Sequence, residues 1–423
     1  MSSTGFRKVA ADSAADSSRV RTHNLCLVVD DVRRHRRTTR SEISERTGLA
    51  RASLTTIIPE LVSAGLLKEV GSTSGPRGGR PVAALEFDGS HVAVVALEIT
   101  VGEVIVESVD LGGRTLRIDR APHGRPIGDP AAVIDTVVDL LLQHLNELDN
   151  LSVAFGLCIV VMPAPLAGDP PVVVASSDLG WGRVDLLGQL VARVPRLEGA
   201  CLLVNDANVA AVAEAAALEA EVGHPLTDLV YLKSLTGIGG GAIVAGNVVT
   251  GARGIGFEPG HVLVRSGGKP CACARHGCFN AEAGPEAVLE DAGLGDLAGR
   301  AGVTIAVAEL VDRARSGDPR TLAALGRAGE VIESVVTDLS LAFDPQVVVL
   351  GGYWADVFNH LRVSTDLGLG EPSARTIAWT NSDESLPFVL PGRLGARAAR
   401  AGAFRLAIDH LLSKPAALHN YNG

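Results

Sequence analysis

Three consecutive segments near the start of the chain carry the hydrophobic spacing of short amphipathic helices. In the first, at about residues 20–35, apolar side chains recur on one stripe. The second begins at Thr39-Arg40-Ser41-Glu42, which has the form of a Thr-x-x-Glu capping box, and ends at Thr47-Gly48. The third covers about residues 51–63, with apolar residues at core spacing. Because glycine permits the tight turn between the last two, the pattern predicts a helix-turn-helix.

The exposed start of the third predicted helix is the expected DNA-reading surface. Its outward positions carry small, polar or basic side chains, as is typical of contacts to base edges and phosphates. These positions are Arg51, Ser53, Thr55 and Thr56.

Two short strand patterns follow the helices, at residues 66–70 and 82–87. The loop between them is rich in glycine, serine and proline and contains Arg77 and Arg80. We interpret the pair as a wing whose arginines reach phosphates or the minor groove. A plain interdomain linker, which the same composition suits, is the alternative.

The remaining chain, residues 90–423, alternates strand and helix patterns. Two segments, 91–116 and 229–250, each predict three strands joined by tight turns. Helices are expected at residues 130–148, 205–221, 305–343 and 394–412. A repeated three-strand meander followed by helix and strand predicts a duplicated α/β fold, with two lobes around a cleft.

Length and composition are compatible with this division. At 423 residues the chain exceeds one ordinary domain, and 47% apolar residues suffice for sizeable cores. No stretch approaches the roughly 20 uncharged apolar residues of a membrane span. Residues 1–18 are small and polar, without the apolar centre of a secretory signal, and are predicted to be a disordered tail. We therefore expect a cytoplasmic protein that binds no membrane.

The distribution of charge changes what the net charge implies. A net charge of −10 would by itself argue against nucleic-acid binding. Residues 19–80, however, contain twelve Lys/Arg and six Asp/Glu, and residues 1–18 balance, so the rest of the chain carries −16. A basic head, residues 19–88, on an acidic body predicts a DNA-binding module joined to a separate sensor. The alternative for the arginine run is a solvated helix face.

The six cysteines are of two kinds. Three lie singly among apolar residues and are interpreted as buried thiols: Cys26, Cys158 and Cys201. Three are clustered: Cys271, Cys273 and Cys278. Ten residues before the first of them stands His261, and one imidazole with three thiolates forms a tetrahedral set that suits structural zinc. In a reducing compartment, clustering favours a metal over a disulfide, with free reduced thiols as the alternative.

Two further motifs belong to the predicted cleft. Asn205-Asp206-Ala207-Asn208 follows a strand pattern and opens a helix, where an aspartate can act as a general base or bind hydroxyls. Simple capping of the helix is the alternative. The glycines of Thr236-Gly237-Ile238-Gly239-Gly240-Gly241, and again Gly351-Gly352, would let backbone N–H groups approach a phosphate closely, although glycine-rich hairpin turns are common.

Together these motifs resemble the ROK family, named for repressors, open reading frames and sugar kinases. The resemblance covers about residue 20 to the C-terminus. It is carried by Gly78-Gly79-Arg80-Pro81, Asn205-Asp206-Ala207-Asn208, Thr236-Gly237-Ile238-Gly239, Glu258-Pro259-Gly260-His261 and Cys271-Ala272-Cys273 through Cys278. It implies a winged helix-turn-helix followed by a two-lobed actin/hexokinase-like (ribonuclease H-like ATPase) domain with a zinc loop at 258–280. It also implies homodimers or homotetramers.

The resemblance also implies roles for individual residues. Asn205 and Asp206 would hydrogen-bond sugar hydroxyls, and Asp206 is the catalytic base in kinase members. Glu258 would contact the sugar. His261 would bind zinc and turn its second ring nitrogen toward the sugar.

Several positions depart from the kinase members of the family. Where those carry Asp-x-Gly-Gly-Thr, this chain reads Glu98-Ile99-Thr100-Val101-Gly102, and branched side chains keep the backbone from closing on a phosphate. Asn280 stands where a sugar-contacting Glu is usual. The turns Met162-Pro163-Ala164-Pro165 and Ser177-Asp178-Leu179-Gly180-Trp181 also differ. We therefore expect that phosphorylation by ATP is lost and that Asp206 is vestigial.

The sequence thus predicts a DNA-binding regulator, a repressor of carbohydrate genes. A dimer would bind an inverted repeat, and a sugar or sugar phosphate in the cleft would control it. One alternative is an ATP-dependent sugar kinase with a fused DNA-binding head. Another is a regulator whose sugar site is inactive and whose body serves for dimerisation or for binding another protein.

Overall fold

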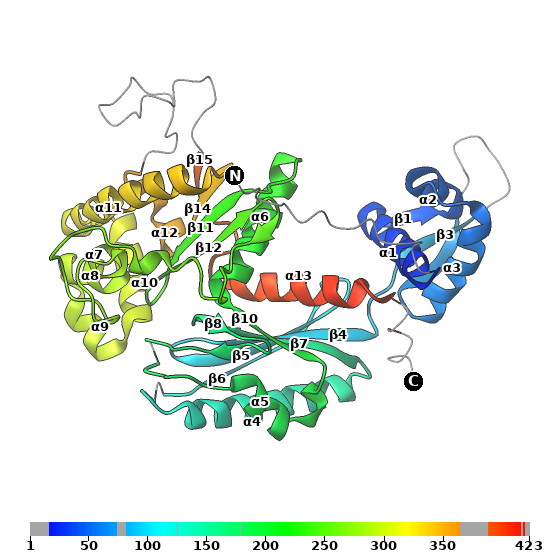
Figure 1. Cartoon of the computed structure of the whole chain (residues 1–423), viewed down its shortest axis with the longest axis horizontal. Helices are drawn as coiled ribbons and strands as arrows, with labels where there is room; N and C mark the ends of the chain where they lie inside the picture. The colour runs from blue at the N-terminus through cyan, green and yellow to red at the C-terminus, as the bar shows by residue number, and fades with distance from the viewer. Residues whose placement is uncertain are drawn as a thin grey trace, which may run out of the picture.

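The computed structural model describes residues 17–73, 82–124, 126–177, 179–363, 388–415 and 418. A small N-terminal head lies beside one end of a larger, two-lobed body (Figure 1). Most of the expected N-terminal tail lies outside the described residues, as does the wing loop with Arg77 and Arg80. Within the described ranges, no helix has both the length and the apolar character needed to span a membrane.

The three helices predicted in the head are confirmed. They are α1 (Ser17–His35), α2 (Arg40–Thr47) and α3 (Arg51–Ser63). Thr39 caps α2 through the predicted box, because its hydroxyl accepts the Glu42 N–H while the Glu42 carboxylate accepts the Thr39 N–H. Gly48 then takes the left-handed conformation, with φ 73°, that turns the chain into α3. Ile43, Leu54 and Ile58 are buried between the helices.

The head also contains a strand that the sequence did not predict. β2 (Leu67–Thr73) and β3 (Val82–Phe87) form the expected antiparallel pair, but β1 (Arg37–Thr39) joins the other edge of β3. The chain leaves α1 at Arg36, whose φ is 57°, so the arginine run is only partly helical. A three-residue strand has no periodicity of its own, since its pairing depends on β3, more than forty residues later.

The body contains two five-stranded sheets with the same plan. The first is built from β4 (Val92–Ile99), β5 (Glu103–Asp110), β6 (Thr115–Pro122), β7 (Ala154–Met162) and β10 (Cys201–Asn205), and the second from β11 (Leu229–Ser234), β12 (Ile238–Val244), β13 (Asn247–Val248), β14 (Val347–Gly352) and β15 (Phe388–Pro391). Their orders are β10-β7-β4-β5-β6 and β13-β12-β11-β14-β15. In each, an antiparallel meander is extended by two parallel strands. The predicted duplication is therefore confirmed.

Helices cover both sheets and fill the space between them (Figure 1). The outer faces pack against α4 (Pro130–Asn150) and α5 (Leu186–Arg193) in one lobe, and α11 (Pro319–Phe343) and α12 (Tyr353–Asp356) in the other. Between the lobes lie α6 (Asp206–Val222) and α13 (Ala398–Leu412). Strand β4 is buried along its whole length, as expected for a strand covered on both faces.

One predicted helical region is divided. Residues 305–343 belong to α10 (Val303–Arg315) and α11, with a break at Ser316-Gly317-Asp318. Gly317 has φ 80°, Asp318 caps α11 and Pro319 occupies its first turn. The smaller elements are β8 (Leu166–Ala167), β9 (Val172–Val173), α7 (Phe279–Ala283), α8 (Pro285–Asp291) and α9 (Gly295–Ala301).

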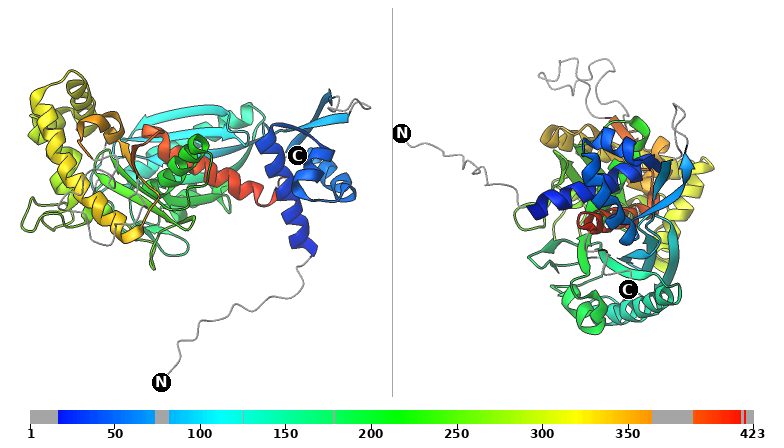
Figure 2. Two further views of the ribbon diagram at one scale, coloured as in Figure 1. Left: turned by 90° about the horizontal axis from the view of Figure 1, so that it is seen from above. Right: turned by 90° about the vertical axis from the view of Figure 1, so that its right-hand side faces the viewer.

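Helix α13 connects the body to the head (Figures 1 and 2). Its apolar residues Ile408 and Leu412 belong to the same hydrophobic core as Leu25 and Val28 of α1. The Cys26 thiol of α1 donates to the Leu412 carbonyl at 3.4 Å. The head is thus packed on the end of a helix whose other end lies between the lobes.

Candidate functional site

A cavity of about 910 Å³ lies between the two lobes. Its walls are the end of β4 with the following turn, the β10–α6 junction, the β11–β12 hairpin and the loop that precedes α7. The four residues predicted to bind sugar all line it: Asn205, Asp206, Glu258 and His261.

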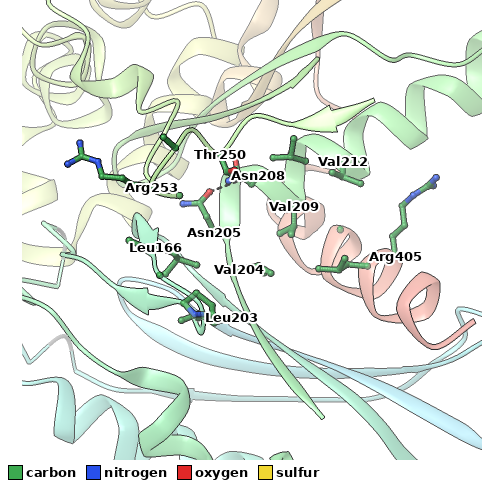
Figure 3. A pocket seen from close by; sticks show the side chains of 18 of the residues that line it. Leu166, Leu203, Val204, Asn205, Asn208, Val209, Val212, Thr250, Arg253 and Arg405 are labelled. Atoms are coloured by element: carbon green, nitrogen blue, oxygen red, sulfur yellow. Dashed lines mark hydrogen bonds between the residues drawn. The ribbon is translucent and has the colours of Figure 1, made fainter. Parts of the chain in front are cut away.

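Asn205 both caps α6 and lines the cavity. Its Oδ1 accepts the Asn208 N–H at 3.0 Å (Figure 3). Its Nδ2 donates to the Ala164 carbonyl at 3.1 Å. The turn at 162–165, which departs from the family pattern, therefore fixes the asparagine. Asn205 can therefore cap the helix and still line a ligand site, so the two interpretations of this motif are compatible.

Asp206 is held in an ion pair that the sequence analysis missed. Its Oδ1 accepts the Ala207 N–H at 2.7 Å, and its Oδ2 is paired with Lys233 Nζ. Asp206 is 9% exposed and Lys233 8%. The available signal was a single lysine at the end of the apolar run at residues 229–232 in strand β11. Because charged side chains are rarely buried unless they are paired, that lysine already implied an acidic partner.

A second buried ion pair lies at the end of β4. The Arg400 guanidinium of α13 donates to the Glu98 carboxylate and, at 2.8 Å, to Glu107 of β5. Arg400 is 4% exposed and Glu107 1%. Burial raises the pKa of Glu98, and the nearby Arg400 opposes that shift. Glu98 lines the cavity, so this pair connects the cavity wall to α13.

Glu258 faces the cavity from the loop after β13. The partial loss of solvent around it, together with the negative charge of Asp206, raises the pKa of Glu258 to about 7. The carboxyl group is therefore poised between its two protonation states near neutral pH. Either state can accept a hydrogen bond from a hydroxyl group, and the ionised state accepts more strongly.

The predicted cysteine–histidine cluster is assembled. The ligand atoms of His261, Cys271, Cys273 and Cys278 all lie within 4.8 Å of one another. The Cys273 and Cys278 sulfurs are 3.6 Å apart, and His261 Nδ1 is 3.7 Å from the Cys271 sulfur. Tetrahedral zinc with bonds of about 2.3 Å to sulfur needs edges of roughly 3.8 Å. The cluster can therefore hold a metal ion, with His261 Nδ1 on the side of the thiolates.

Asn280 has a structural contact that explains its presence at the cavity. It lies in α7, directly after the last cysteine, and its Oδ1 accepts the Ile238 N–H at 2.8 Å. The cysteine loop is thereby tied to the glycine-rich hairpin. At the other glycine motif, a Cβ on Gly352 would overlap the Ser234 carbonyl, so the close packing of β14 on β11 accounts for that residue.

The expected DNA-reading residues lie on the first turns of α3. Arg51, Thr55 and Thr56 are exposed, and Ser53 is half-buried. The Thr55 hydroxyl donates to the Arg51 carbonyl and the Thr56 hydroxyl to the Ser53 carbonyl, both at 2.9 Å. The hydroxyl oxygens can still accept hydrogen bonds from outside the helix.

Some known proteins are similar in sequence to nearly the whole chain, and others to part of it. The xylose repressor of Bacillus subtilis (strain 168) is 24% identical over 403 residues, which cover 94% of this chain and 98% of the repressor. The N-acetylmannosamine kinase of Escherichia coli O157:H7 is 35% identical over 151 residues, 36% of this chain and 48% of the kinase.

Two solved structures share the fold. The crystal structure of a ROK family transcriptional regulator, a homolog of the E. coli Mlc protein, has a TM-score of 0.71 at 18% identity, covering 96% of this chain and all of the other. A ROK family glucokinase from Streptomyces griseus, in complex with glucose and AMPPNP, has a TM-score of 0.59 at 22% identity and covers 74% of this chain and 98% of its own. The ROK family model matches residues 95–409, about three quarters of the sequence. The chain therefore belongs to the ROK family.

Proposed function

We propose that this protein is a sugar-responsive transcriptional repressor whose head binds operator DNA and whose cleft binds the effector. One observation carries the proposal: a helix-turn-helix is packed on α13, and Arg400 of α13 is paired with Glu98, which lines the candidate sugar cleft. The full-length similarity to a xylose repressor supports it, since that similarity includes both head and body.

The proposed DNA contacts combine one helix and a wing. Arg51, Ser53, Thr55 and Thr56 of α3 would enter the major groove, and Arg77 and Arg80 would reach phosphates or the minor groove. A homodimer or homotetramer would place two such heads on an inverted repeat, with half-sites about 34–36 Å apart.

The proposed effector site is the cleft between the lobes. Asn205, Asp206, Glu258 and His261 present amide, carboxylate and imidazole groups to one cavity, a set suited to hydrogen-bonding several hydroxyls. Structural zinc bound by His261, Cys271, Cys273 and Cys278 would fix the loop that carries Glu258 and, through Asn280, the hairpin opposite.

A sugar kinase is the alternative, favoured by the retained Asp206 and glycine-rich hairpin. Two observations argue against it. Ile99, Thr100 and Val101 fill the first turn with branched side chains, and Asp206 is neutralised by Lys233. A general base must accept a proton from the substrate, which the ion pair disfavours. A coupled assay of ADP release over a panel of hexoses distinguishes the two functions, because turnover of roughly 1–100 s⁻¹ would show that the protein is a kinase.

Signal transfer would follow α13. A second, mainly apolar pocket of about 850 Å³ lies behind the β10–α6 junction, between α6 and α13 (Figure 3). This space leaves room for the lobes to turn about the junction when the cleft closes on a ligand. Such a turn moves α13 and the head packed on its end, and the ligand shifts DNA affinity by its preference for one state.

The function is tested by fluorescence anisotropy on DNA fragments enriched from the source genome. Titrations run with and without xylose, glucose and N-acetylmannosamine, the sugars that the relatives' names suggest. We expect one sugar to change DNA affinity about 5–150-fold, the usual range of allosteric coupling. DNA affinity that no carbohydrate alters at saturation would refute the switch.

A further inference from the structure

The cleft wall is acidic, and most of its charged groups are already paired within the protein. Among the described residues that line it are four carboxylates, Glu98, Glu103, Asp206 and Glu258, but one ammonium group, that of Lys233. Granting the proposed sugar-binding function, we propose that the effector is an uncharged sugar rather than a phosphosugar or a nucleotide. Lys233 and Arg400 would determine this specificity.

Lys233 is the one cation of the described cavity wall, and it is already used. Its ammonium group is paired with the Asp206 carboxylate, and both side chains are about nine-tenths buried. To bind a phosphate, Lys233 would have to leave Asp206 as an uncompensated buried charge. An anionic ligand would also meet the carboxylates of Glu98 and Glu258. The pair therefore blocks the phosphate chemistry that a lone lysine would provide.

Uncharged hydrogen-bond donors at the glycine-rich hairpin are also less available to a phosphate. The Ile238 N–H, at the glycine-rich hairpin, is bound by Asn280 Oδ1. Apolar side chains line the two facing turns: Ile99 and Val101 on one side, and Leu235, which is 42% exposed, on the other. A phosphate placed here would exchange its hydration for apolar surface, which is unfavourable.

Arg400 is paired with Glu98, the carboxylate that a complex of metal ion and nucleotide would need. A divalent cation prefers free carboxylate oxygens, but Glu98 already receives the Arg400 guanidinium, which also binds Glu107. The Arg397 guanidinium lies 3.4 Å from Glu107 as well. The chain therefore compensates these acids with its own arginines. Asn205 and Glu258 also line the cavity, and their amide and carboxyl groups suit hydroxyls.

Paired titrations test the ligand class. Calorimetry on the full chain compares glucose with glucose 6-phosphate and N-acetylmannosamine with its 6-phosphate, and includes xylose. We expect a neutral sugar to bind at least about tenfold more tightly than its phosphate, the cost of placing one charged group without a partner. A phosphosugar that binds as tightly as its parent sugar would overturn the proposal. That result would leave the DNA switch intact, whereas sugars that bind without altering DNA affinity would count against the switch alone.

A second arm is independent of which sugar is correct and uses inorganic pyrophosphate as the probe. Asp206→Asn frees Lys233, so this variant should bind pyrophosphate about tenfold or more tightly than the wild type. The double variant Asp206→Asn/Lys233→Met, which replaces the ion pair by neutral side chains of similar size, should lose that gain. Thermal melting confirms that each variant is folded, and the double variant provides the comparison if the single one is unstable. Wild-type protein that binds pyrophosphate as well as Asp206→Asn does would show that Lys233 is available to anions, and would refute the proposal.

Discussion

At the scale of single residues, the cleft is organised by charges that lie far apart in the sequence. Asp206 is paired with Lys233 of the next strand, and Glu98 is paired with Arg400, about three hundred positions later. Arg400 alone in the sequence looks like an ordinary surface side chain, whereas Lys233 stands within an apolar strand. In the folded protein both cations are buried and paired, because an unpaired buried charge is strongly destabilising.

The cysteine cluster gives a prediction at this scale. Cys273→Ser should abolish binding of one zinc ion per chain and lower the melting temperature, because structural zinc contributes directly to folding free energy. Mass spectrometry of metal content and thermal melting measure the two effects. Cys201→Ser, outside the cluster, is the matched control and should keep its zinc. Carefully purified wild-type protein without zinc would contradict the prediction.

Glu258 predicts a dependence of sugar affinity on pH. Its pKa is raised to about 7, so the carboxyl is mainly protonated below that value and ionised above it. If the ionised form holds the sugar, affinity should fall as the pH is lowered through 7. Calorimetry between pH 6 and 8 measures this, and Glu258→Gln should flatten the profile. A wild-type affinity that is constant over this range would show that the ionised form of Glu258 does not hold the sugar.

Before ligand binds, Glu258 should affect stability in the opposite direction. A carboxyl whose pKa is raised on folding favours the folded state most below its unfolded pKa of 4.5, and this contribution is lost as the pH rises through 7. The ligand-free protein should therefore gain from this residue as the pH falls below 7. Comparing wild type with Glu258→Gln in urea isolates that contribution from those of other groups.

At the scale of elements, the regular segments followed from local signals. The Thr39 capping box, the turn at Gly48 and the two meanders all formed where the sequence predicted them. Strand β1 was not predicted because it has no local signal of its own, and α10 and α11 were predicted as one helix. β1 exists because β3 pairs with it, and the break between α10 and α11 is marked by Gly317-Asp318-Pro319, which the longer hydrophobic period concealed.

Helix α3 gives the prediction for DNA. Arg51→Met removes one exposed cation from its first turn, and we expect operator affinity to fall by about 1–3 kcal/mol if it contacts a base, or the salt dependence to decrease by about one charge if it contacts a phosphate. Fluorescence anisotropy at several salt concentrations distinguishes the two cases. Arg300→Met, in α9 of the body, should change neither quantity. An unaltered titration for Arg51→Met would remove it from the proposed interface.

Helix α13 gives a prediction for stability. Arg400→Met leaves Glu98 buried without its guanidinium, and Glu107 with that of Arg397 alone, and should lower the free energy of unfolding by about 3–5 kcal/mol. Arg405→Met on the same helix is the control, because Arg405 is 50% exposed and its pair with Asp409 is 3.9 Å long. We expect the control to change stability by less than about 0.5 kcal/mol. Equal losses in urea denaturation would show that the Arg400 ion pairs are not special.

At the scale of the whole molecule, head and body act through one shared core. The sequence predicted the two-lobed cleft and four of the residues that line it, because each of their motifs is local. It did not predict that α13 contacts both the cleft wall and α1, since that arrangement depends on how distant segments pack. The same arrangement gives a physical route from a ligand between the lobes to the DNA-binding head.

The coupling of cleft and head is tested most directly by the affinity of the full chain for its selected operator, measured by anisotropy with and without saturating sugar. We expect one sugar to shift the dissociation constant at least about fivefold, and Arg51→Met to weaken binding in both states. If DNA affinity is the same with every sugar that calorimetry shows to bind, the cleft and the head are not coupled, and the protein is not a sugar-responsive switch.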